Sequence, residues 1–484
     1  MRMLPVLVLL LWTVVGLGAV DLTMDMTMAI RATARPWSGA SAAAQAWERH
    51  LLAGWQAAGP RDPRWDQDMP GILAAAAERA VWPSHLPPPR QTDALRRLLR
   101  HLKDQRLGAD PTARFAAMIL EPEERKQYPH VDVLVRTRSA SMAALPAGCM
   151  MGAMAHAICY GSWNGSPKAA TTQPPLAADL AWYLSESLVR GEFDAAPHVY
   201  LTHLDYLGMS TPRDLTVLES TLLSRSLNAW AMTDPWCRAM IEGHLASLQA
   251  WAARGHGFSD TVTQEGWDRF AHHQQRAAQW FRIAWAARKD DPAPAIELME
   301  LARSRDAGGP PDTWLALALD AGFDHPGIHA SLRTYTAPRW GGSFAAQAGM
   351  ARSYVETGRF DTLIPWQFVR MVLQIDGDRH PPGRDSEALR DPAMAVALHA
   401  CIDGYLALVP GTDTALRGYY ESHRIGALVR LGRRDEARAR LQSLAKPLLR
   451  DEALAAWGVS AKELLREDAK PEPPPAAPAP DPGF

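Results

Sequence analysis

A long helical pattern runs from Glu265 to Arg288 and reads EGWDRFAHHQQRAAQWFRIAWAAR. Its large apolar residues recur every three or four positions, which is the spacing that places side chains on one face of an α-helix. These residues are Trp267, Phe270, Trp280, Phe281, Ile283 and Ala284. The stretch contains neither proline nor an internal turn signal, so it predicts one long amphipathic helix that must bury its apolar face against another element.

The same periodicity recurs along most of the chain, in segments joined by short connections that contain glycine or proline. Three capping side chains each precede a proline that suits the first helical position, at Asp110-Pro111, Thr211-Pro212 and Asp234-Pro235. Short connections favour antiparallel packing of neighbouring helices. Only residues 130–136 (HVDVLVR) have a strand-like pattern, and they are too few to indicate a sheet. The sequence therefore predicts an all-α fold of antiparallel helix pairs.

Three turns between predicted helices resemble one another: RGEFD at 190–194, TGRFD at 357–361 and LGRRDEA at 431–437. Each glycine is expected to take a positive φ and end one helix, and each aspartate to favour the start of the next. Gly358 and Gly432 are 74 residues apart, about twice the roughly 34-residue tetratricopeptide period. Ile425 stands where that repeat usually has a small residue. We therefore expect a degenerate tetratricopeptide-like α-α superhelix.

Proline-rich gaps at 83–89 and 161–175 suggest the domain boundaries. They divide the chain into an N-terminal helical region at 31–135, an apolar helix with a Gly/Pro/Ser-rich connection at 140–175, and a helical repeat-like domain at 176–468. Residues 469–484 are dense in proline, which cannot donate backbone hydrogen bonds, and predict a disordered tail.

The N-terminus has the layout of a secretory signal. Arg2 precedes an uncharged apolar run from Leu4 to Val20, whose distal end contains the small residues Gly16 and Gly18. Residues 1–20 are expected to be either a signal peptide or an uncleaved anchor, with 4–20 as a possible membrane tether. In both cases the rest of the chain would be exported to the periplasm, free or anchored to the inner membrane.

Composition restricts the functions further. The net charge of -2 argues against nucleic acid as a partner, because phosphate binding requires a positive excess. The 18 tryptophans favour helix packing over a ligand role, since most lie in apolar-periodic segments. The four cysteines are expected to be either paired or simply buried; they are Cys149, Cys159, Cys237 and Cys401.

No cluster identifies a reaction. His325 and His329, with Asp324, could lie on one side of a helix, but Pro326 and Gly327 intervene and no third ligand is evident. The run from Cys149 to Cys159 offers the soft donors that copper prefers, yet it also has the pattern of a buried helix. We therefore predict no catalytic residue, no metal and no cofactor.

The most specific string is PRWGGS, which consists of Pro338, Arg339, Trp340, Gly341, Gly342 and Ser343. It resembles the signature of a bacterial family named domain of unknown function 4034, and the resemblance extends over roughly residues 180–450. It implies a helical repeat-like fold and no activity.

The residue types in this string also suit a local structural role. Pro338 is expected to end one helix, the two glycines to permit a tight backbone path, and Ser343 to cap the next helix. Trp340 would be wedged between the two helices. A binding role for Arg339 and Trp340 is the alternative.

These observations favour a non-catalytic, exported scaffold whose stacked helices receive a protein or peptide partner. The alternative is a periplasmic glycan-processing enzyme with a tryptophan-rich cleft and two carboxylates as acid and base. Facing carboxylates in a deep tryptophan-lined pocket would favour the enzyme, and a shallow groove would favour the scaffold.

Overall fold

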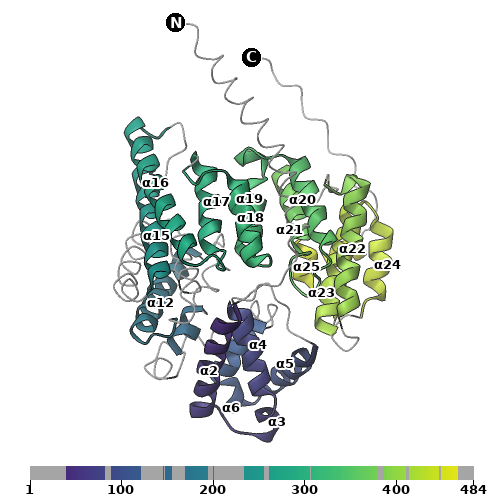
Figure 1. Cartoon of the computed structure of the whole chain (residues 1–484). Helices are drawn as coiled ribbons and strands as arrows, with labels where there is room; N and C mark the ends of the chain where they lie inside the picture. Colours follow the sequence, from purple (N-terminus) through teal and green to yellow (C-terminus); the bar gives the residue numbers. More distant parts are fainter. Residues whose placement is uncertain are drawn as a thin grey trace. The chain divides into compact units, whose positions relative to one another are not determined.

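The computed structural model describes residues 40–81, 89–120, 145, 148–154, 169–193, 200, 234–255, 261–305, 307–379, 386, 388–409, 414–445 and 448–466. The described ranges contain helices and no β-strand, which confirms the all-α class (Figure 1). None of the helices in the described ranges has the length and apolarity needed to cross a membrane. The predictions for residues 1–20, 130–136 and 469–484 fall outside these ranges and stay predictions.

The chain separates into two compact units between Pro365 and Trp366. The labelled helices of the first unit are α2 (Ala40–Ala58), α3 (Pro63–Asp66), α4 (Met69–Val81), α5 (Pro89–His101), α6 (Gln105–Gly108), α7 (Pro111–Leu120), α12 (Ala169–Val189), α15 (Pro235–Arg254), α16 (Gln264–Ala287), α17 (Ala293–Arg305), α18 (Pro311–Gly322), α19 (Pro326–Tyr335), η2 (Pro338–Trp340) and α20 (Phe344–Glu356).

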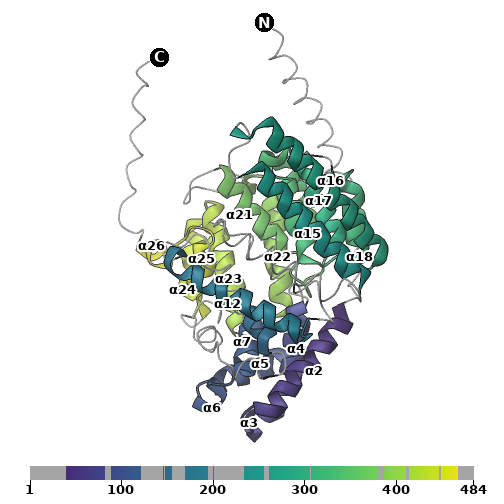
Figure 2. The same cartoon turned by 90° about the vertical axis from the view of Figure 1, so that its left-hand side faces the viewer.

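The helix predicted from Glu265 to Arg288 is α16, and it begins and ends within one residue of the expected bounds. It packs along α15, and α17 and α18 follow at its side, so helices that are neighbours in sequence are also neighbours in space (Figure 2). Its buried residues include Phe270, Phe281 and Ala284. Exposed Ile283 is an exception to the predicted apolar face, with 48% of its surface accessible.

The helix starts confirm two of the three expected caps. The Asp110 carboxylate accepts a hydrogen bond from the backbone N–H of Ala113 (2.8 Å), and Asp234 accepts from Trp236 (2.9 Å). These bonds satisfy N–H groups that lack a partner in the first helical turn. Thr211 lies outside the described residues.

All three similar turns contain the expected left-handed glycine. The φ angles are 65° at Gly191, 65° at Gly358 and 73° at Gly432. After Gly432, the Arg433 N–H bonds back to the carbonyl of Leu428, which is the pairing of a Schellman helix end. The prediction that the turn's aspartate starts the next helix is confirmed at Asp435, which lies in the first turn of that helix.

The prediction that the turn's aspartate starts the next helix is wrong at Asp361, because that helix begins only at Gln367. Asp361 instead accepts two hydrogen bonds from the Arg359 guanidinium (2.8 and 2.9 Å). Thr362 extends the turn, since its hydroxyl bonds to the Arg359 carbonyl and accepts from the Ile364 N–H. These local bonds stabilise a turn that extends to the start of the next helix at Gln367.

The domain bounds suggested by the proline-rich gaps, 31–135, 140–175 and 176–468, stay predictions, and the packing of the described helices can be set beside them. One continuous apolar core joins α2–α7 with α12 and α15–α17. The division at Pro365 instead falls inside the expected 176–468 domain. The helix α12 also begins at Ala169, within the expected connection. Proline and glycine mark breaks between helices, whereas domain boundaries depend on which helices share a core.

Many tryptophans serve helix packing. Trp47, Trp55, Trp65, Trp236 and Trp457 are among the largest fully buried side chains. An arginine guanidinium also lies over several tryptophan rings. At Trp236, the Cζ atom of Arg288 is 4.9 Å from the ring centroid. Such contacts combine a large apolar area with a favourable charge–quadrupole interaction.

Two aspartates and two arginines form a charge cluster around Trp65. Asp62 and Asp104 each cap a short helix, and Arg64 donates side-chain hydrogen bonds to both carboxylates (2.8 and 2.9 Å). Arg106 donates to Asp62 at 3.1 Å. The hydrogen bonds from Arg64 hold the pKa of Asp62 well below its ordinary value of 3.8, and those from Arg106 and Arg64 also lower that of Asp104.

We expect this cluster to stabilise the first unit less in acid. Because both folded-state pKa values are depressed, the stabilisation is present above pH 3.8 and is lost as the pH falls toward the folded-state values. Chemical unfolding of the wild type and of Arg64→Met should therefore differ most at neutral pH, and the difference should shrink in acid. A difference that stays constant down to about pH 3 would contradict the assignment.

The second unit contains α21 (Gln367–Arg379), η3 (Ala388–Arg390), α22 (Pro392–Leu408), α23 (Thr414–Arg430), α24 (Arg434–Ser443), α25 (Asp451–Ala455) and α26 (Ala461–Arg466). Sequence neighbours again pack together: α22 on α23, and α23 on α24 (Figure 1). Ile425 and Leu428 of α23 meet Ala437 and Leu441 of α24 in one apolar cluster.

A buried polar network ties three elements of the second unit together. Arg430 donates a hydrogen bond to the Asp376 carboxylate at 3.2 Å, with side-chain exposures of only 8% and 4%. The Ser386 hydroxyl donates to the same carboxylate (2.9 Å), and its backbone N–H donates to the Arg430 carbonyl (2.8 Å). The network therefore fixes α21, the segment before η3 and the end of α23 relative to one another.

Candidate functional site: a groove on the α23–α24 hairpin

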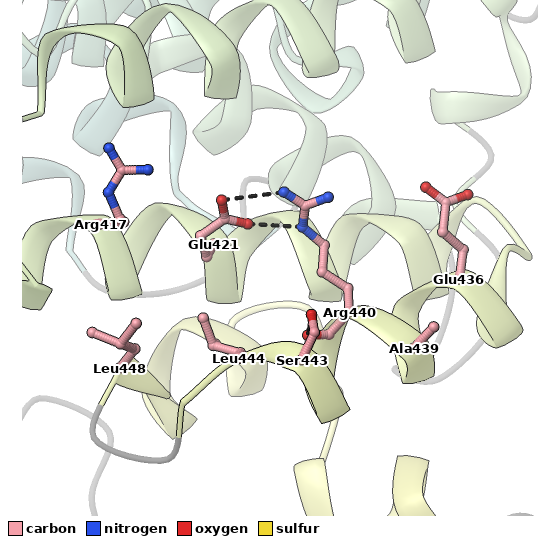
Figure 3. Close-up of a pocket in the computed structure, with 8 residues that line it drawn as sticks. All are labelled: Arg417, Glu421, Glu436, Ala439, Arg440, Ser443, Leu444 and Leu448. Atoms are coloured by element: carbon pink, nitrogen blue, oxygen red, sulfur yellow. Dashed lines mark hydrogen bonds and ion pairs between the residues drawn. The ribbon is translucent and has the colours of Figure 1, made fainter. Parts of the chain in front are cut away.

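An open groove lies along the hairpin formed by α23 and α24 and the segment that follows it (Figure 3). Its volume is about 480 Å³. The residues that line it are Arg417, Glu421, Glu436, Ala439, Arg440, Ser443, Leu444 and Leu448. In Figure 3 the charged groups form a row beside Ser443, Leu444 and Leu448.

The hairpin's amphipathicity explains why these side chains share a face. Ala437 and Leu441 of α24 are buried against α23, whereas Ala439 and Ser443 are exposed. On α23, Arg417 and Glu421 are four residues apart and therefore lie one above the other. The left-handed turn at Gly432 reverses the chain, so that the polar faces of both helices border the same groove.

A glycine in α23 allows the segment that follows α24 to approach α23 closely. A Cβ atom on Gly418 would collide with the carbonyl oxygen of Leu448, so the backbone contact is possible only without a side chain there. Four residues further along α23, the Ser422 hydroxyl accepts a hydrogen bond from the Arg450 N–H (3.0 Å). These two contacts hold Leu448 at the edge of the groove.

Most of the groove's charges are neutralised within the hairpin. Arg440 donates two hydrogen bonds to the Glu421 carboxylate, at 2.8 and 3.2 Å, and this pairing raises the pKa of Arg440 above its ordinary value. Glu436 pairs with Arg433. Arg417 differs, because its one contact among the described residues is a 3.5 Å hydrogen bond to the Val409 carbonyl, at the outer limit for such bonds.

The PRWGGS turn is placed between α19 and α20 in the first unit. Gly341 has a φ of 91°, and a Cβ on Gly342 would collide with the Thr336 carbonyl oxygen. The Ser343 hydroxyl caps α20 by accepting from the Ala346 N–H at 3.0 Å. The expected roles of both glycines and of the serine are thus confirmed.

Trp340 does not lie where we expected it. It is 45% exposed, so it is not wedged between the two helices. The reason lies in the turn itself: Pro338–Trp340 form a short 3-10 helix that connects α19 to α20. The turn belongs to the first unit, and the groove belongs to the second.

The two candidate metal-binding histidines have separate structural roles. His325 caps α19 by accepting from the Gly327 N–H at 3.1 Å. His329 is fully buried and donates from Nε2 to the Phe323 carbonyl (2.7 Å), while Nδ1 faces the Tyr354 hydroxyl (3.3 Å). Burial lowers the pKa of His329 to about 4, so the ring is neutral at neutral pH. In the described ranges, no three His, Cys, Asp or Glu side chains are arranged to hold a metal ion.

The described cysteines are buried, and no disulfide joins any two of them: Cys149, Cys237 and Cys401. Burial raises the pKa of Cys149 to about 12. Cys149 lies in the apolar core with the methionines that follow it, Met150, Met151 and Met154. Cys159 lies outside the described residues.

Sequence reasoning did not identify Arg417, Glu421 and Arg440 as a site. The available signal was weak: charged residues four apart on one predicted helix, next to a second charged helix. Neither a known protein-family model nor a curated protein matches the chain. The groove's own geometry therefore carries the functional argument.

Proposed function

We propose that this protein is a non-catalytic scaffold that binds a protein or peptide partner, and that the α23–α24 groove is its binding surface. The observation that carries the proposal is the pairing of an apolar strip, Leu444 and Leu448, with a row of charged side chains on an open hairpin face. Extended or helical peptides use such surfaces, because their apolar side chains fill the strip while polar groups meet the rim.

The groove suits the alternative, a glycan-processing enzyme, less well. Such an enzyme needs two carboxylates on either side of the scissile bond, one of them able to donate a proton. Here Glu421 is held by two hydrogen bonds from Arg440, and Glu436 pairs with Arg433. None of the eight lining residues is aromatic, whereas sugar-binding clefts commonly offer an aromatic face.

The wider setting of this proposal is a periplasmic helical-repeat protein of the tetratricopeptide-like kind, within the domain of unknown function 4034 family. Its support is the PRWGGS string, the three left-handed glycine turns and the packing of each helix on its sequence neighbours. Stacked helix pairs present extended surfaces, which is how such arrays usually bind partners.

A groove-filling substitution tests the proposal. Ala439 is exposed and lines the groove, so Ala439→Arg should block it without disturbing the core. The full-length protein is first used to select binders from a display library of random short peptides. We expect the selected peptides to lose about tenfold or more in affinity for Ala439→Arg, because a new side chain occupies their contact area.

Gln442→Arg is the matched control, because Gln442 is an exposed residue of the same helix that does not line the groove. It should bind the selected peptides as the wild type does, and circular dichroism should show equal helix content in all three proteins. The proposal fails if no peptides are selected, or if Ala439→Arg and Gln442→Arg bind them equally well.

A further inference from the structure

We propose that the groove selects acidic segments: Arg417 receives the side-chain carboxylate of a bound peptide, and a neighbouring apolar side chain of that peptide packs on Leu444 and Leu448. This inference rests on the proposed function and specifies the chemistry of the partner. It concerns a carboxylate within the peptide chain, not the free carboxyl end.

The first argument is the charge at one end of the groove. Arg417, Glu421 and Glu436 all border it, but the two glutamates already have guanidinium partners within the hairpin. In Figure 3 two dashed lines join Glu421 to Arg440, and none reaches Arg417. Among the described residues no carboxylate pairs with Arg417, so an incoming acidic group would meet a positive charge there that no described side chain compensates. An incoming basic group would meet carboxylates that are already occupied.

The second argument is the donor geometry of arginine. A guanidinium has five N–H donors in a planar fork that matches a carboxylate. The described structure uses a single Arg417 donor, in the long contact to Val409. The remaining donors can bind a carboxylate without breaking an existing ion pair.

The third argument is the placement of the apolar strip. Gly418 follows Arg417 and abuts the backbone of Leu448, so the positive end of the groove is also the end that Leu448 borders. Leu444 continues the strip beside the Glu421–Arg440 pair (Figure 3). A peptide with an acidic residue next to a leucine-like residue would satisfy both features at once.

Two sets of synthetic peptides with blocked ends test this inference on the full-length protein. One set combines Asp or Glu with leucine, alanine and glycine, and the other replaces each acid by Asn or Gln. We expect the acidic set to bind about tenfold or more tightly by fluorescence anisotropy, since one charge-assisted hydrogen-bond pair distinguishes the sets. Added salt should weaken binding of the acidic set more than that of the amide set.

The arginine variants identify the residue responsible. Arg417→Met should remove the preference for the acidic set, and Arg417→Lys should keep part of it, because the charge remains and the fork is lost. Arg466→Met removes an exposed positive charge of the same unit outside the groove and should leave the preference unchanged.

The possible failures are distinguishable. Equal binding of both sets, with both still blocked by Ala439→Arg, would overturn the acidic preference and leave the scaffold proposal standing. A preference that survives Arg417→Met would also overturn it. Absence of any binding sensitive to Ala439→Arg would overturn both proposals.

Discussion

Replacing Arg430 by methionine is expected to lower the free energy of unfolding of the second unit by about 3–5 kcal/mol. The change leaves the Asp376 carboxylate, only 4% exposed, without its guanidinium partner. The hydrogen bonds from the Ser386 hydroxyl and the Ala388 N–H would remain, but they do not supply a positive charge. An unpaired buried charge is among the most destabilising changes that a single substitution can make.

Hydrogen exchange of backbone amides in α21 and α23 measures this effect in the full-length protein, since it reports on one unit at a time. The protection of these amides should fall in Arg430→Met, while that of α15 and α16 in the other unit should not change. Unchanged protection in α21 and α23 would show that the Asp376–Arg430 pair does not stabilise this unit.

Two further variants separate charge burial from loss of the arginine itself. Arg433→Met breaks an exposed pair with Glu436 and should cost less than about 1 kcal/mol. Combining Arg430→Met with Asp376→Leu removes both buried charges and should recover a large part of the lost stability. A double variant as unstable as Arg430→Met would mean that packing, and not the unpaired carboxylate, causes the loss.

Gly342→Ala is expected to destabilise the first unit by about 3 kcal/mol, the upper end of the usual range for overpacking. The added methyl group would overlap the backbone carbonyl of Thr336, which cannot move without disturbing the end of α19. The Thr336 hydroxyl bonds to the Leu332 carbonyl (2.8 Å), and the Gly342 N–H bonds to the Ala337 carbonyl (3.2 Å), so the turn is held from both sides.

Gly349→Ala in α20 is the matched control. A Cβ at this position meets nothing within 4 Å, and the residue is in the interior of a helix. The same chemical change should therefore stabilise the protein by about 0.5–1 kcal/mol, because alanine loses less conformational freedom than glycine. Chemical unfolding of the two variants should move the midpoint in opposite directions. A shift of the same sign and size would contradict the steric role of Gly342.

This pair of variants also bears on the PRWGGS string. If Gly342→Ala destabilises the turn, the residue types of that string are explained by backbone geometry at Gly341 and Gly342 and by the Ser343 cap. Trp340, at 45% exposure, is the member that such geometry does not require.

The sequence predicted the local structure well where a single residue type has a single physical consequence. Asp110 and Asp234 cap helices because a carboxylate can accept from N–H groups that have no helical partner. Gly191, Gly358 and Gly432 end helices because only glycine takes a positive φ without steric cost. The long helix at 264–287 followed directly from its apolar spacing.

Features that depend on distant residues were not predictable in this way. The division at Pro365 depends on which helices share a core, and loop composition carries no information about that. The groove depends on Gly418 lying against Leu448, a contact between segments that periodicity treats as independent. Within the described ranges, the lack of a carboxylate partner for Arg417 likewise appears only once Glu421 is seen to be held by Arg440.

Local sequence patterns were thus sufficient to predict that this chain forms helices, where many of them begin and end, and that they must bury their apolar faces against one another. Which helix faces remain open, and which charged side chains have no opposite charge beside them in the described ranges, became apparent from the packing of the helices. The physical reason is that secondary structure follows from interactions within a few residues, whereas a binding surface is what remains exposed after all the long-range contacts have formed.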